Sequence, residues 1–179
     1  MASDGVSFNL REKFGLRLCA GLDGGGGLPT LFRSRALTEA TEEDVEALRA
    51  LGIEVVHDLR KETERVANPE PATVRSAFEV RICPVDLQDD ESRTQETKSR
   101  HVKAAYGRPG ERMRFLYGVM ADHADAVRSI ARSVIADGKP ALVHCANGKD
   151  RVGVVCASVQ LACGVSRNAV MADYLLTNE

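Results

Sequence analysis

The sequence predicts an α/β protein in which a central, mostly parallel sheet is flanked by helices. Three observations lead to this prediction. Short β-branched segments alternate with amphipathic helical segments, and the links between them are short. The chain has 179 residues, which is the length of one domain. We therefore expect a single domain over residues 1–179.

The predicted strands are short apolar or β-branched segments bounded by turn residues, at 53–59, 78–85 and 141–144, and residues 30–37 are predicted to form a short strand and then a turn. Thr41 and Asp44 form a capping box, which predicts a helix that ends at Gly52. Apolar spacing predicts a long helix over 111–136, and an apolar helix over 153–163 ends before Gly164.

The segment from Asp86 to about residue 110 is polar and charged over much of its length. One interpretation is a solvated loop or helix. The other is a mobile flap over a functional site, since long connections with little core of their own are often functional. Both interpretations stay open at this point.

Composition excludes several classes of protein. The 24 basic and 26 acidic side chains give a formal charge of −2, which disfavours a general nucleic-acid binder. No apolar run has the length of a membrane span and no secretory signal is visible, so we expect a cytoplasmic protein. Five cysteines without CxxC spacing and four scattered histidines predict no metal site and no disulfide framework. We also expect no cofactor. The Ala-, Arg- and Val-rich composition fits a bacterial enzyme.

The candidate functional residues lie in the loop between the strand that ends at His144 and the next helix. Such a loop aims backbone N–H groups and the positive end of a helix dipole at one point, which makes an anion site. Gly148 lets the loop curl, and the fork of Arg151 grips two oxygens of a phosphate. The predicted phosphate-binding residues are Ala146, Asn147, Gly148, Lys149, Asp150 and Arg151.

Cys145 lies inside this positive field, which is expected to lower the pKa of its thiol and favour the nucleophilic thiolate. The alternative is a small apolar residue at a strand end. We interpret His144 as support for the loop, holding its backbone by hydrogen bonds, rather than as a base.

The spacing His144-Cys145-x5-Arg151 resembles the signature loop of the protein tyrosine phosphatase superfamily. With Gly148-Lys149-Asp150-Arg151 it is similar to bacterial tyrosine/lipid phosphatases. Family-like segments cover nearly the whole chain in the expected order: Asn9–Glu12, Leu31–Ser34, Val56–Arg60 with Glu64, and Ala172–Leu176. One departure is Val152, where the family carries a serine or threonine whose hydroxyl contacts the cysteine sulfur.

The resemblance implies a tyrosine/dual-specificity phosphatase-like fold and a two-step, metal-independent hydrolysis through a phosphocysteine on Cys145. Arg151 would stabilise the transferring phosphoryl group. Asp86 is the first candidate for the general acid and Asp150 the second, with helix or loop capping as the other interpretation of either aspartate. Lys149 would favour substrates rich in negative charge.

The expected substrates are phosphotyrosine, a phosphoinositide, or a small phosphorylated metabolite such as a sugar or nucleoside phosphate. The alternative function is a phosphate-binding pseudophosphatase that recognises a phosphorylated partner, which Val152 favours. We expect no nucleic-acid partner and no transmembrane segment.

Overall fold

The structure is a computed structural model that describes residues 9–27, 29–85 and 123–178. Its five strands form one sheet in the order β1-β2-β5-β3-β4. The strands are β1 (Arg17–Asp23), β2 (Thr30–Ser34), β3 (Val55–Asp58), β4 (Glu79–Ile82) and β5 (Ala141–His144). The pairs β2–β5, β5–β3 and β3–β4 are parallel, and β1 pairs antiparallel with β2 at one edge. The mostly parallel sheet predicted from the sequence is confirmed.

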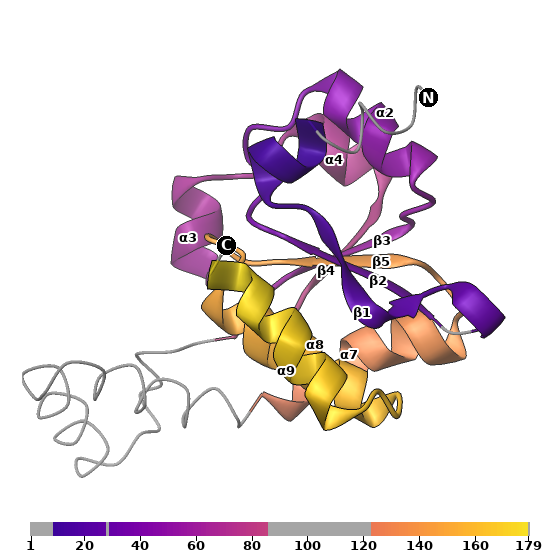
Figure 1. The fold of residues 1–179 in the computed structure, drawn as a ribbon. Coiled ribbons are helices and arrows are strands. Elements are labelled where there is room, and N and C mark those ends of the chain that lie inside the picture. The colour runs from indigo at the N-terminus through magenta and orange to yellow at the C-terminus, as the bar shows by residue number, and fades with distance from the viewer. Residues whose placement is uncertain (1–8, 28, 86–122, 179) are drawn as a thin grey trace, which may run out of the picture.

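Helices cover both faces of the sheet (Figure 1). On one face lie α2 (Glu42–Ala50) and α4 (Ala72–Ala77), together with the helix over residues 9–14. On the other lie α7 (Ala124–Ala131), the π-helical turn η2 (Arg132–Ala136), α8 (Asp150–Ala162) and α9 (Arg167–Leu175). The remaining short elements are α3 (Glu62–Ala67), η1 (Gly25–Gly27) and η3 (Leu176–Asn178).

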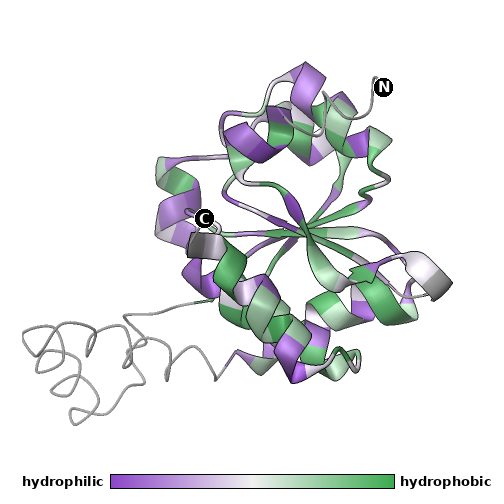
Figure 2. Ribbon diagram, viewed as in Figure 1, coloured by the Kyte–Doolittle hydropathy of each residue, from purple (hydrophilic) through white to green (hydrophobic). Residues whose placement is uncertain are grey.

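The central strand β5 is buried on both faces. Ala141 and Val143 contribute to the core beneath α7 and α8, whereas Leu142 contributes to the core beneath α2 and α4. Successive side chains of a strand point to opposite faces, so an uninterrupted apolar strand is suited to a sheet with two cores. In Figure 2 both strands and helices carry hydrophobic residues next to hydrophilic ones, as expected of elements that pack on one side and face water or the site on another.

The predicted elements differ from the observed ones mainly at their ends. The capping box of Thr41 and Asp44 is present, and β5 has the predicted bounds. The predicted strands at 53–59 and 78–85 are shortened to β3 and β4, because only those residues pair in register. Helix α8 begins at Asp150, three residues before the prediction, because the first turn carries polar residues that the apolar pattern omits.

The elements that were not predicted from the sequence include β1, α3, α4, α9 and the helix over residues 9–14. The predicted long helix is present over 124–136, with a π-helical turn from Arg132, while 111–122 lies outside the described residues. The segment 86–110 also lies outside them, so the flap and the single domain over 1–179 stay predictions. In the described part of the chain, no helix has the length and apolar character of a membrane span.

One buried histidine on β3 gives the fold a pH dependence. His57 is fully buried, its Nε2 lies 2.9 Å from the Ser133 hydroxyl, and its Nδ1 lies 3.6 Å from the Cys83 sulfur. Burial, and then the nearby Arg81 guanidinium, lower the pKa of His57 from 6.5 to about 4. Because the unfolded chain takes up this proton first, stability is lost as pH falls through that window.

We expect the wild type to lose about 3 kcal/mol more unfolding free energy between pH 7 and pH 4 than a His57→Gln variant, which cannot titrate there. Urea unfolding of both proteins across this range checks the difference. Parallel pH curves for the two proteins would contradict this assignment of the proton.

Candidate active site

Three strands end in the same row of the sheet. Ser34 of β2, His144 of β5 and Asp58 of β3 are register partners, so the segments that follow them leave from one edge. The Leu59 amide donates to the His144 carbonyl at 2.9 Å, and the Val85 amide donates to the Leu59 carbonyl at 3.0 Å. Ligands of open parallel sheets bind at such carboxyl edges.

The loop between β5 and α8 is held by its carbonyl groups. Arg33 Nη2 donates to the carbonyls of Gly148 at 2.9 Å and Lys149 at 3.3 Å, and the Ala36 amide donates to the Ala146 carbonyl at 3.2 Å. In a planar trans peptide the next N–H points opposite to the carbonyl. The amides that follow these three carbonyls therefore face away from Arg33 and Ala36.

Within the described residues, no group accepts a hydrogen bond from the amides of Ala146, Asn147, Gly148 or Lys149. These four amides immediately precede α8, whose dipole adds positive charge at its start. Consecutive unpaired amides at a helix start bind anions, phosphate above all.

Gly148 is the residue on which this loop geometry depends. Its φ is +66°, and a Cβ there would lie 2.6 Å from the Arg35 amide nitrogen and 2.7 Å from the carbonyl atoms of Ser34. Neither neighbour is a side chain that can move aside. Only glycine permits this approach of the loop to the end of β2.

Arg151 lies in the first turn of α8, and Glu64 holds its guanidinium in place. Its Nη1 and Nη2 donate to the two carboxylate oxygens of Glu64, on α3, at 2.6 and 2.7 Å. Burial works to lower the pKa of Arg151, but hydrogen bonds and charge interactions with Glu64 and Cys145 raise it, and the net change is upward. The same pairing lowers the pKa of Glu64, so both side chains are charged. A bidentate carboxylate fixes the plane of the guanidinium.

Cys145 is the first residue after β5 and is 2% exposed. It packs in the same core as Val152, which is fully buried in the first turn of α8. Cys145 also interacts with the Arg151 guanidinium. The structure therefore brings together the predicted nucleophile and the predicted phosphate-binding arginine.

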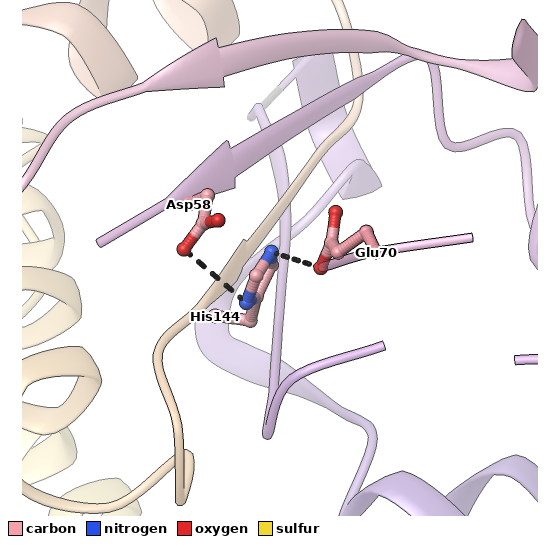
Figure 3. A group of neighbouring side chains, drawn as sticks. All are labelled: Asp58, Glu70 and His144. Atoms are coloured by element: carbon pink, nitrogen blue, oxygen red, sulfur yellow. Dashed lines mark ion pairs between the residues drawn. The ribbon is translucent and has the colours of Figure 1, made fainter. Parts of the chain in front are cut away.

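Beneath the loop, His144 lies between two buried carboxylates (Figure 3). Its Nε2 is 2.9 Å from Glu70 Oε1, and its Nδ1 is 3.8 Å from Asp58 Oδ1 and 3.4 Å from the Cys145 carbonyl. Both ring nitrogens therefore face oxygen atoms. Arg60, 2% exposed, completes the cluster through Asp58 at 2.8 Å and Glu70 at 3.6 Å.

Asp58, Glu70 and His144 bring potential metal-ligating atoms within 4.8 Å of one another. The scattered histidines of the sequence gave no sign of this grouping. The Arg60 guanidinium already places a positive charge against both carboxylates, which disfavours a cation between them. We interpret the group as a buried ion network that supports the loop.

The other predicted site residues lie at or beside the loop. Asn147 and Lys149 are exposed, and Ala146 is partly buried. Asp150 is the first residue of α8 and is partly buried. Asp86 lies outside the described residues. Sequence reasoning placed Glu64 only within a family-like segment and did not single out Glu70, because no local spacing links them to Arg151 or His144.

A sequence profile of the tyrosine phosphatase family matches residues 25–179. The chain belongs to this family. It is 35% identical over 169 residues to the triple specificity protein phosphatase PtpB of Mycobacterium tuberculosis, covering 83% of this chain and 61% of that protein. A relative from Cupriavidus necator is 30% identical over 167 residues, covering 89% of this chain and 58% of its own. The chain thus spans about three fifths of the length of these curated relatives.

The fold agrees with that family. A crystal structure of a kinase associated phosphatase superposes with a TM-score of 0.53 at 10% identity, covering 88% of this chain and 80% of that one. At this identity the similarity establishes the fold alone.

Substituting Gly148 tests the loop geometry of this tyrosine phosphatase family member. Gly148→Ala is expected to lower the unfolding free energy by about 2–5 kcal/mol, because it adds backbone strain and a clash with Ser34 and Arg35. The matched control is Gly164→Ala, where φ is +83° but a Cβ meets nothing within 4 Å, so about 1–2 kcal/mol of strain is expected. Urea unfolding compares the two, and equal losses would contradict the close approach.

Proposed function

We propose that the protein is a cysteine-dependent phosphatase that hydrolyses phosphate monoesters through a phosphocysteine intermediate. One observation carries the proposal. Four consecutive loop amides, which have no acceptor among the described residues, immediately precede α8, with Cys145 before them and the oriented guanidinium of Arg151 after them. This arrangement supplies a nucleophile, an anion cradle and a fixed positive charge in one short segment.

In the first step the Cys145 thiolate attacks phosphorus. A sulfur–phosphorus bond forms while the bond from phosphorus to the ester oxygen breaks, and that oxygen leaves with a proton from a carboxylic acid. The loop amides and Arg151 bind the equatorial phosphoryl oxygens, where negative charge gathers in the transition state. The Glu64 pair holds the guanidinium in place before substrate arrives.

In the second step a water molecule attacks phosphocysteine. Its oxygen bonds to phosphorus, the sulfur–phosphorus bond breaks, and the sulfur returns as a thiolate. The carboxylate left by the first step accepts the proton of the water, which restores the acid. The products are the alcohol and inorganic phosphate.

Asp86 is the proposed acid and Asp150 its competitor. Support for Asp86 comes from the residue before it: Val85 is fully buried and its amide bonds to Leu59 at the carboxyl edge of the sheet. Val85 therefore lies at the edge of the sheet where Cys145 lies. Asp150 is closer in sequence to the cradle and occupies the first turn of α8, where a carboxylate also suits the helix dipole.

The proposed substrate is a phosphotyrosine, a phosphoinositide or a small phosphorylated metabolite. The relative PtpB is named a triple specificity phosphatase, which supports a site that admits more than one class of ester. The exposed Lys149 at the loop adds positive charge for anionic substrates.

Val152 favours a second candidate, a pseudophosphatase that binds phosphorylated partners without turnover. Its fully buried side chain lies in the core with Cys145 and offers the sulfur no hydroxyl donor. A missing charge-assisted hydrogen bond, worth about 1.5–3 kcal/mol, would slow the departure of the thiolate in the second step. The intact cradle and the Arg151–Glu64 pair suit both candidates.

Substituting the nucleophile separates the two candidates. Cys145→Ser is expected to lower hydrolysis of 4-nitrophenyl phosphate by about a thousandfold or more, while inorganic phosphate still binds because Arg151 and the amides remain. Steady-state kinetics and calorimetry measure the two quantities. EDTA should leave wild-type activity unchanged and vanadate should inhibit it. A wild type that binds phosphate without hydrolysing any ester would favour the pseudophosphatase.

The two aspartates are distinguished by the leaving group. If Asp86 is the acid, Asp86→Asn lowers kcat/KM for alkyl phosphates by about a hundredfold or more, whereas aryl phosphates with acidic leaving groups lose far less. The basic limb of the pH–rate profile should also flatten. The same pattern in Asp150→Asn, with little change in Asp86→Asn, would exchange the two roles.

A further inference from the structure

A cavity of about 600 Å³ lies beside the predicted phosphate-binding loop. Arg11, Arg17, Arg33 and Arg35 line it, and Asn147 and Gly148 of the loop form part of its wall. A volume of this size is typical of small-molecule sites. Nothing in the two-step reaction above uses this cavity.

Two of the four arginines build the wall of the cavity. Arg17 is paired with Asp173, and its Nη2 also donates to the Asp173 carbonyl at 2.8 Å. Arg33 is 2% exposed and holds the Gly148 and Lys149 carbonyls. Arg33 therefore contacts the cavity on one side and fixes the loop on the other.

The other two arginines are available to a ligand. Arg11 and Arg35 are both exposed. Within the described ranges, neither has an acidic partner, and the hydrogen bond of the Arg35 side chain goes to the Lys13 carbonyl. Glu12 is the one acidic side chain among the described residues that line the cavity. The lining therefore keeps an excess of positive charge beside the loop.

We propose that this arginine-lined cavity binds a second anionic group, a phosphate or a carboxylate, of the same substrate whose phosphate ester occupies the loop. The inference rests on the proposed function and narrows its substrates to esters that carry two anionic groups. Planar guanidinium forks match phosphate and carboxylate oxygens in pairs, which gives both affinity and orientation.

The path between the two sites crosses the exposed part of the loop. The Lys149 amide of the cradle faces away from Arg33, whereas the cavity lies on the Arg33 side, so the substrate must reach over the exposed side chains of Asn147 and Lys149. A substrate with two anionic groups therefore needs a spacer of defined length between them. A substrate with one phosphate uses the cradle alone.

Kinetics with a graded set of substrates test this arrangement. The substrates are straight-chain alkanediol bisphosphates of two to eight carbons, each compared with the alkyl monophosphate of the same length. We expect one spacer length to be preferred, and Arg11→Gln and Arg35→Gln each to lower kcat/KM for that bisphosphate by about tenfold. Both variants should leave the monophosphate within twofold. Arg49→Gln, an exposed arginine on α2 that does not line the cavity, is the charge-matched control.

Three results would overturn the proposal: equal losses for bisphosphate and monophosphate, a similar loss in Arg49→Gln, or no preferred spacer. A change in monophosphate turnover on adding free inorganic phosphate, absent from Arg35→Gln, would also overturn it, because the cavity would then bind a separate anion.

A binding measurement separates this inference from the proposed function. Calorimetry of Cys145→Ser with alkane bisphosphonates and matched monophosphonates measures the cavity without any turnover. The bisphosphonate of the preferred length should bind about tenfold more tightly, and Arg35→Gln should abolish that advantage. This result would support the cavity even if the wild type hydrolysed no ester, and its absence would overturn the cavity even in an active phosphatase.

Discussion

The buried guanidinium of Arg60 is the interaction on which the loop side of the molecule depends. It donates to both carboxylate oxygens of Asp58 and to the Asn68 carbonyl at 2.8 Å, and it approaches Glu70. Those groups belong to the end of β3 and to the segment after α3, and the two carboxylates flank His144 at the end of β5. Without Arg60, two buried carboxylates would lose their countercharge, and breaking such a pair costs about 3–5 kcal/mol. One side chain thus joins three separate segments beneath the cradle.

The pairing of buried guanidinium groups with acceptors, seen at Arg60, also explains how the site carries positive charge at little cost in stability. Arg151 is nearly buried, yet Glu64 accepts hydrogen bonds from both of its terminal nitrogens, so the buried charge is paired. Arg33 donates to the carbonyl oxygens of Gly148 and Lys149, which carry no formal charge. Its positive charge therefore lies beside the loop and is not neutralised by these acceptors. Each buried cation is therefore matched by acceptors that also define its orientation.

Local parts of the fold and site could be predicted from the sequence, and long-range parts could not. The capping box at Thr41 and the strand–loop–helix segment around Cys145 lie within a few residues of chain, so their patterns are visible directly. By contrast, the contact of Glu64 with Arg151 depends on which strands become neighbours. β1 was missed because its glycine and its irregular pairing with β2 break the alternation of a regular strand. The position of Asp86 stays a prediction.

The place of β5 in the sheet has a consequence for how the chain folds. β2 and β3 do not pair with each other; both pair with β5, which comes more than eighty residues after β3 in the chain. The cores on both faces also take apolar side chains from β5. During synthesis β2 and β3 therefore cannot join one sheet until β5 has been made, and their apolar side chains stay exposed until then. Such non-local pairing slows folding and leaves the nascent chain open to aggregation or to chaperone binding.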